Sequence, residues 1–180
     1  MNGSRTLRRV IPFLAVATLA VLAAAPATAL AGLGESTCVV ISSGQVTCWG
    51  DNSYGQLGNG SSTSSLVPVE VSGVTTATRV AVGIRHACTL LSTGRVNCWG
   101  DNTYGQLGDS SNTNSQVPVG VTGVTAATQV TTGSYHSCAR LSSGKVACWG
   151  IQGSGVLGNN SNSNSNTPVE VSGITTATQV

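Results

Sequence analysis

The sequence is built on an internal repeat of 50 residues, and this period limits the folds open to the chain more than any other feature. Cys38, Cys88 and Cys138 begin three similar segments, with no insertion or deletion between them. A fixed period in this range is typical of solenoids, propellers and linear arrays. Inside each segment, short runs of Val, Thr and Leu are broken by Gly, Asn, Asp and Pro, without an apolar stripe of helical period. The sequence therefore predicts an all-β chain of repeated sheets.

Residues 1–29 have the three parts of a secretory signal peptide. Three arginines precede Val10–Ala25, an uncharged apolar run of 16 residues, and small residues follow it. The Ala-x-Ala patterns predict cleavage after Ala29 or after Ala31. The alternative is a retained anchor, although the run contains a Pro and is shorter than the roughly 20 residues that span a bilayer. We therefore expect a leader helix that is removed on export, and no stable membrane insertion afterwards.

The leader carries most of the apparent basicity of the chain. The full sequence has a formal net charge of +2, but removing the leader leaves five basic and six acidic residues, a net charge of −1. Binding to phosphate backbones depends on clustered Lys and Arg. The charge therefore argues against a nucleic acid as partner.

Each repeat predicts a β-hairpin closed by a disulfide. In the second repeat, His86–Leu91 and Arg95–Gly100 read as strands joined by the turn Ser92–Gly94. Centring the hairpin on this turn places Cys88 opposite Cys98. Paired cysteines behind a signal peptide favour disulfides, whereas the nine intervening residues do not fit the short spacing of zinc ligands. The predicted bonds are Cys38–Cys48, Cys88–Cys98 and Cys138–Cys148, each worth roughly 2–3 kcal/mol.

Other residues of the repeat predict its packing. Trp99 and Leu107 are the expected apolar anchors, packing against the following unit, while Asp101 and Asn102 can cap a turn. The segment Val117–Val121 contains a Pro and reads as an outer strand, because an edge strand need not donate every hydrogen bond.

The pattern G-x-x-H-x-C-x-x-L-x-x-G-x-V-x-C-W-G-x-N-x-x-G-Q-L-G, followed by Pro-Val, covers Gly83–Val130. It resembles the RCC1 repeat (regulator of chromosome condensation 1). The resemblance implies a β-propeller of four-stranded blades, usually seven, of which this chain would supply about three, over residues 30–79, 80–129 and 130–180. The family includes a nuclear exchange factor for a small GTPase. It also includes secreted bacterial relatives, one type being a protein inhibitor of β-lactamases.

The chain departs from the pattern in places. The third repeat has Ile151–Ser154 where the others have Asp-Asn-x-Tyr, and Val156 replaces Gln. The sequence stops at Val180, where a fourth blade would begin. Open blade faces are apolar and do not stay unpaired, so we expect either a fragment of a longer propeller or a unit that completes itself by assembly.

Four side chains are candidates for binding a ligand or protein: Arg85, Tyr135, Tyr54 and Tyr104. The first two stand in the turn before the repeat histidine, at positions where the repeats differ, and the resemblance implies that this turn opens onto one face of the propeller. The polar tracts either bind, as surface loops often do, or are spacers; they are Asn59–Ser65, Asp109–Ser115 and Asn159–Asn166.

Histidines and acids of the repeat favour structural roles. His86 and His136 occur once per repeat with no positioned partner for acid–base chemistry, so a packing role is favoured over a catalytic base. Asp51, Asp101 and Asp109 favour turn capping over calcium binding, which needs converging carboxylates. We expect no catalytic residue, no metal ion and no cofactor.

These features favour an exported, non-enzymatic binding module whose partner is a protein or a cell-surface ligand. An alternative is a secreted enzyme inhibitor, by likeness to the β-lactamase inhibitors. Nucleotide exchange on a small GTPase is a further alternative that export disfavours. All three rest partly on the resemblance, because a fold alone does not fix a function.

Overall fold

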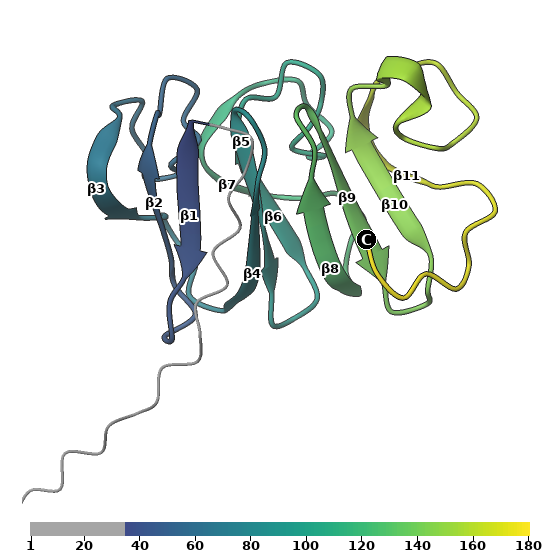
Figure 1. Ribbon diagram of the computed structural model, residues 1–180, viewed down its shortest axis with the longest axis horizontal. Helices are drawn as coiled ribbons and strands as arrows, with labels where there is room; N and C mark the ends of the chain where they lie inside the picture. Colours follow the sequence, from purple (N-terminus) through teal and green to yellow (C-terminus); the bar gives the residue numbers. More distant parts are fainter. Residues whose placement is uncertain (1–34) are drawn as a thin grey trace, which may run out of the picture.

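The structure, a computed structural model, describes residues 35–180. The expected leader helix and its cleavage sites lie outside these residues. Within them the chain forms eleven β-strands and one short 3-10 turn, and the strands make three antiparallel sheets (Figure 1). The fold is therefore all-β, as the sequence predicts.

Blade 1 is a sheet of order β1-β2-β3, blade 2 has the order β4-β5-β6-β7, and blade 3 has the order β11-β10-β9-β8. The element bounds are β1 (Ser36–Val40), β2 (Val46–Gly50), β3 (Ser65–Glu70), β4 (Ala77–Val82), β5 (His86–Leu91), β6 (Val96–Gly100), β7 (Ser115–Gly120), β8 (Ala127–Thr132), β9 (His136–Leu141), β10 (Val146–Gly150), η1 (Gly153–Gly155) and β11 (Ser165–Glu170).

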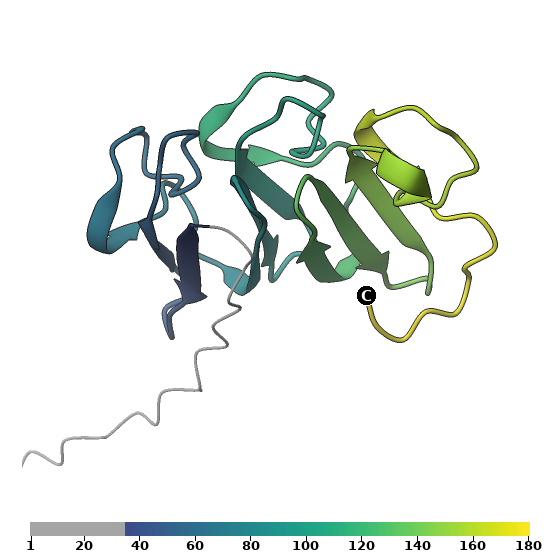
Figure 2. The same cartoon turned by 45° about the horizontal axis from the view of Figure 1, so that its top comes forward.

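The three sheets stand side by side and fan outward like the blades of a propeller (Figures 1 and 2). Strand β4 contacts both β1 and β8, so the first strand of a blade lies against its neighbours, while β3, β7 and β11 are outer strands. Blade 2 spans 77–120 and blade 3 spans 127–170. The repeat boundaries at 79 and 129 therefore fall inside β4 and β8.

The central hairpin of each blade forms as the sequence predicts. Strand β5 pairs with β6 so that Cys88 lies opposite Cys98, with their Cα atoms 4.0 Å apart. Gly94 adopts a φ of 79° in the turn, and its N–H donates to the Leu91 carbonyl at 3.0 Å. Disulfides join all three predicted pairs: Cys38–Cys48, Cys88–Cys98 and Cys138–Cys148.

Apolar cores lie between neighbouring blades, and the tryptophans set the direction of packing. Trp99 is fully buried among residues of blade 1, and its indole N–H donates to the Gln56 carbonyl at 2.8 Å. Trp99 thus packs against the preceding blade, and the expectation that it faces the following unit is wrong. The reason is local, because Gly58 has no Cβ and leaves room for the indole, 2.8 Å from where a Cβ would lie. Leu107 does cluster with the following blade, through Trp149.

Candidate functional site

Two equivalent turns carry the predicted binding residues. Arg85 stands between β4 and β5, and Tyr135 stands between β8 and β9. Each turn is closed by a glycine N–H that donates to the histidine carbonyl at 2.8 Å, in Gly83 and Gly133. The two turns also meet directly, because the Ile84 N–H donates to the Ser134 carbonyl at 3.4 Å. The turns therefore hold their outward side chains at neighbouring blade boundaries.

The structure brings all four predicted side chains together as two pairs. The Arg85 guanidinium carbon lies 4.4 Å from the centroid of the Tyr54 ring, which is a cation–π contact. Tyr135 meets Tyr104 edge to face, with ring centroids 5.6 Å apart and planes at 69°. Each pair joins a turn of one blade to the loop of the preceding blade. We call these four half-exposed residues the Arg/Tyr edge.

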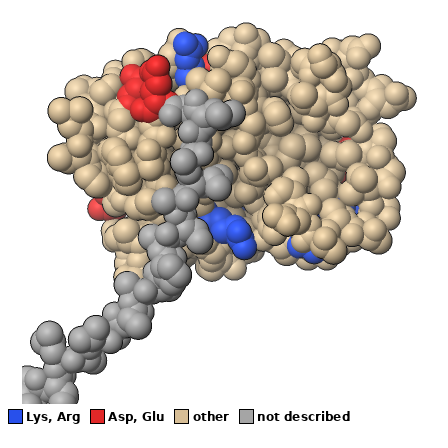
Figure 3. All heavy atoms as spheres, viewed as in Figure 1, with Lys and Arg blue, Asp and Glu red and all other residues tan. Residues whose placement is uncertain are grey.

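The Arg/Tyr edge lies at the end of the sheets where β2 and β6 finish, at the top in Figure 1. The face shown in Figure 3 carries few charged atoms, and acidic and basic groups meet near this top edge. Within residues 35–180 the one ion pair joins Lys145 to Glu170 at 3.0 Å. The Arg85 guanidinium therefore packs on an aromatic ring and forms no ion pair with a carboxylate of residues 35–180. Its N–H groups can donate to a carboxylate of another molecule.

Buried asparagines fix the loops that carry Tyr54 and Tyr104. In blade 2, the Asn102 amide donates to the Ser111 and Thr113 carbonyls, both at 3.1 Å, and its oxygen accepts the Leu107 N–H at 2.9 Å. Asn52 makes the equivalent bonds in blade 1. Part of each polar tract is thus wrapped around a buried side chain. In blade 3, Gln152 takes over this role, since its oxygen accepts the Leu157 N–H at 2.7 Å.

The aspartates cap turns, as the sequence predicts. Asp51 Oδ1 accepts the Ser53 hydroxyl at 2.7 Å, and Asp101 Oδ1 accepts the Thr103 hydroxyl at 2.6 Å. These bonds stabilise the carboxylate, so the Ser53 hydroxyl lowers the pKa of Asp51, against the opposing effect of partial burial. Residues 35–180 contain no group of three or more His, Cys, Asp or Glu placed to hold a metal ion.

His86 is part of a buried hydrogen-bond chain between blades 2 and 3. Ser137 Oγ donates its hydrogen to the Gln106 carbonyl at 3.0 Å. His86 Nε2 lies 3.0 Å from Ser137 Oγ, and must therefore be the donor in the bond between them. Trp149 Nε1 donates to the same carbonyl at 2.9 Å. Burial lowers the pKa of His86 to about 4. His86 is therefore a neutral structural residue at pH 7.

Sequence reasoning missed the partners of this histidine. The hydroxyl of Ser137 is decisive, yet the same position is Ala87 in the preceding repeat. The usable signal was this difference, because Ser137 follows a repeat that carries His86, whereas Ala87 follows a repeat that has Ser36 at the histidine position. His136 is half-buried, and burial lowers its pKa as well.

Comparison with known proteins agrees with this architecture, which is that of propeller blades. A family model described as the regulator of chromosome condensation (RCC1) repeat matches residues 43–90 and 93–140, and a second model of the same description matches 77–106 and 127–156. The matches take in more than half of the chain. The protein belongs to the RCC1 repeat family.

Individual relatives match only in part. Human E3 ubiquitin-protein ligase HERC2 is 44% identical over 57 residues, which is 30% of this chain and 1% of that protein. Human WBSCR16 is 25% identical with a TM-score of 0.70, over 81% of this chain and 40% of that one. Yeast Prp20p, described with its binding to Gsp1p and histones, is 17% identical with a TM-score of 0.70, over 79% of this chain and 37% of its own. The yeast match shows the shared fold alone.

Proposed function

We propose that the chain is an exported, non-enzymatic binding module that contacts a protein or cell-surface ligand through the Arg/Tyr edge. The observation that carries this proposal is the pairing of Arg85 with Tyr54 and of Tyr135 with Tyr104. Tyr and Arg dominate the energetics of protein interfaces. Because each side chain already rests on a partner, ordering it on binding costs little conformational entropy.

Export rests on the leader and on the disulfides. Three disulfides are typical of a chain that folds in an oxidising compartment. In the part of the chain that the structure describes, no helix has both the length and the hydropathy needed to cross a bilayer. Cell fractionation tests the proposal: the chain belongs in the medium or envelope fraction without residues 1–29 or 1–31, and recovery of the uncleaved chain from the cytosol would contradict export.

Affinity capture from secreted and envelope fractions tests the binding edge. We expect the wild-type chain to retain a saturable partner, and the double variant Arg85→Ala, Tyr135→Ala to bind it at least about 10-fold more weakly. Arg95→Ala is the matched control, because Arg95 is an exposed arginine of the same blade in the turn at the opposite end of β5. Equal loss in the control, or no saturable partner for the wild type, would contradict the proposal.

Inhibition of a secreted enzyme is the second candidate. The favouring observation is that every tyrosine of the chain lies on the Arg/Tyr edge, where aromatic anchors would insert into a partner's cleft. Assays against a panel of secreted hydrolases, β-lactamases included, separate this candidate from simple adhesion. Nucleotide exchange, tested by release of labelled nucleotide from small GTPases, ranks last because an exported chain would not meet them.

A further inference from the structure

Both internal blade boundaries use the same set of contacts. A tryptophan lies on a glycine of the preceding blade and donates to a carbonyl there: Trp99 to Gln56 O at 2.8 Å, and Trp149 to Gln106 O at 2.9 Å. A loop N–H of the preceding blade then donates to the outer strand of the next. These bonds are Gly60 N to Gln116 O at 3.0 Å and Ser110 N to Asn166 O at 2.9 Å.

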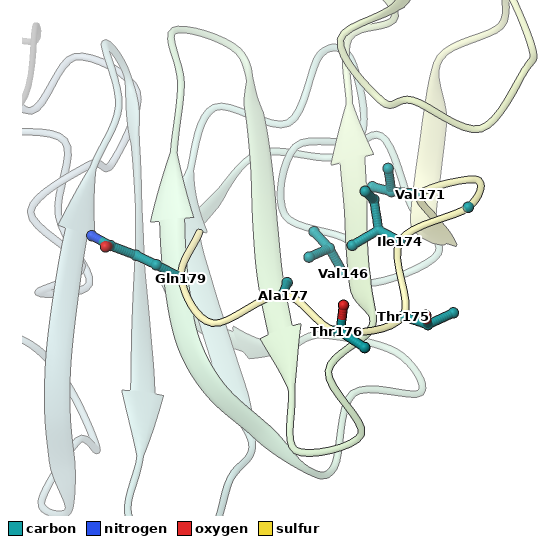
Figure 4. Close-up of a pocket in the computed structure, with 8 residues that line it drawn as sticks. Val146, Val171, Ile174, Thr175, Thr176, Ala177 and Gln179 are labelled. Atoms are coloured by element: carbon teal, nitrogen blue, oxygen red, sulfur yellow. The ribbon is translucent and has the colours of Figure 1, made fainter.

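The third blade has the same glycine, carbonyl and loop N–H groups that receive the next blade at the two boundaries. Within residues 35–180, no other blade contacts them. A Cβ on Gly55 or Gly105 would strike the next blade, at 2.8 Å from Gln116 and 2.5 Å from Asn166, whereas Gly155 has no atom within 4 Å. A cavity of about 570 Å³ lies at this glycine, and Gly155, Gly158 and Asn160 are among its lining residues. A second cavity, of about 430 Å³, lies between Val146 of β10 and the segment 171–179 (Figure 4). We call this surface the socket.

The first blade presents the inserting half of such a boundary on the side that meets no other blade among residues 35–180. Trp49 is only half-buried, although its equivalents Trp99 and Trp149 have no exposed surface. Leu66 is 100% exposed. Its equivalents, Gln116 and Asn166, accept the loop N–H of the preceding blade. The socket offers apolar surface in return, because Val156 and Ile174 are each 42% exposed. We call the Trp49 and Leu66 surface the plug.

Histidine and hydroxyl positions match the plug to the socket specifically. At the boundary of blades 2 and 3, His86 donates to Ser137. The equivalent histidine at the socket is His136, and the plug carries a hydroxyl, Thr37, at the position of Ser137. At the remaining boundary the histidine position is a serine, and the opposing residue is Ala87. The one such histidine contact in residues 35–180 therefore pairs a histidine with a hydroxyl, and Thr37 would give His136 the same partner.

The C-terminal residues of the chain repeat the sequence of the first strand of a blade. Blade 1 has three strands within the described residues, while blades 2 and 3 have four. Residues 177–180 read Ala-Thr-Gln-Val, identical to the first four residues of β8, which pair with β9. By the same register, Val180 would face Val39 of β1 in another blade 1.

We propose that the socket binds the plug of a second copy of this chain, head to tail. Trp49 of one copy packs against Gly158 of the other and donates to the Val156 carbonyl, and the Asn160 N–H donates to the Leu66 carbonyl. Residues 177–180 add to the edge of β1 that is unpaired within residues 35–180. The contact is heterologous, with different surfaces on the two copies, so it builds either a closed ring or an open spiral.

Light scattering and mixing of variants test this contact on the exported chain. We expect the wild type to form head-to-tail assemblies whose mass rises with concentration. Leu66→Asp disables the plug, and Gly155→Asn disables the socket, since Asn tolerates a positive φ but fills the open space. Each variant alone should be a single chain, while their mixture should form a dimer and nothing larger, because one intact plug meets one intact socket.

A control variant and a substitute variant keep the test independent of folding. Glu70→Lys, at the exposed far end of the same strand β3, should assemble like the wild type, because a Cβ on the equivalent Gly120 would meet no atom of another blade within 4 Å. If Gly155→Asn fails to fold, Val156→Asp takes its place at the socket. A wild type that stays a single chain up to about 100 µM overturns the proposal and leaves the socket to a further blade or another protein. So does a mixture that forms no dimer.

Discussion

At the residue scale, His86 shows how burial turns a titratable side chain into a structural one. Its ring is fully buried between blades 2 and 3, with Nε2 bonded to Ser137 and Nδ1 without a partner. Desolvation lowers its pKa most, Asp101 raises it, and His136 lowers it further. The imidazole is therefore neutral in the fold, and its Nε2–H donates to the Ser137 hydroxyl of the neighbouring blade.

Acid should weaken the fold through this residue. The pKa of His86 is about 4 in the fold against 6.5 in the unfolded chain, so the unfolded state binds the proton first. Titration of His86 therefore leaves the unfolding free energy unchanged above about pH 6.5. As the pH falls toward 4, protonation of this residue in the unfolded chain lowers the unfolding free energy by about 3 kcal/mol. Urea denaturation at several pH values measures this loss.

His86→Gln is the control for the acid sensitivity. It should flatten the pH dependence between pH 6.5 and 4, with a residual slope from His136, whose pKa is also lowered. The carboxyl of Asp51 titrates below this window, because its pKa is lowered from 3.8. An unchanged slope in the variant would assign the acid sensitivity elsewhere.

At the element scale, each blade contains a short hairpin whose two strands are joined by a disulfide between directly opposite residues. Strands β5 and β6 keep a regular register from His86 to Leu90, and both half-cystines are fully buried. The loop between them is short, so the bond removes a modest amount of entropy from the unfolded chain. Buried sulfur atoms also fill part of the inter-blade core.

Removing one disulfide should lower the unfolding free energy by a limited amount. The double variant Cys88→Ala, Cys98→Ala should lose roughly 2–3 kcal/mol of unfolding free energy, by loop closure alone. Urea denaturation followed by far-UV circular dichroism measures it. Reducing the wild type under the same conditions provides the comparison. No loss in either sample would mean that the register, and not the covalent bond, holds the hairpin.

At the scale of the whole molecule, the blades depend on their neighbours, since two of the three buried apolar clusters of residues 35–180 lie between adjacent sheets. Trp149 comes from blade 3 but is buried in the cluster that contains Leu107 of blade 2. Stability in such arrays is the sum of unit terms and nearest-neighbour interface terms. The tryptophans are the largest side chains of those interfaces.

Truncating an internal tryptophan should therefore uncouple two blades. We expect Trp149→Ala to lower the unfolding free energy by about 3–5 kcal/mol and to let blade 3 unfold before blade 2. Hydrogen exchange, resolved by blade, measures both effects. Trp49→Ala, at the free side of blade 1, should cost less than half as much in dilute solution. Equal losses would contradict the neighbour-dependent core.

The sequence alone determined the repeat, the all-β class, the hairpins and the cysteine pairing. These features depend on contacts within one hairpin, where turn residues and strand alternation decide the register, as for Cys88 and Cys98. It also pointed to Arg85 and Tyr135, because they vary within a regular repeat.

Only the tertiary structure decided what each blade meets. The packing of Trp99 on the preceding blade, the bond from His86 to Ser137 and the pairing of Arg85 with Tyr54 all join residues more than 30 positions apart. Such contacts follow from the twist and placement of whole sheets, which no local pattern encodes.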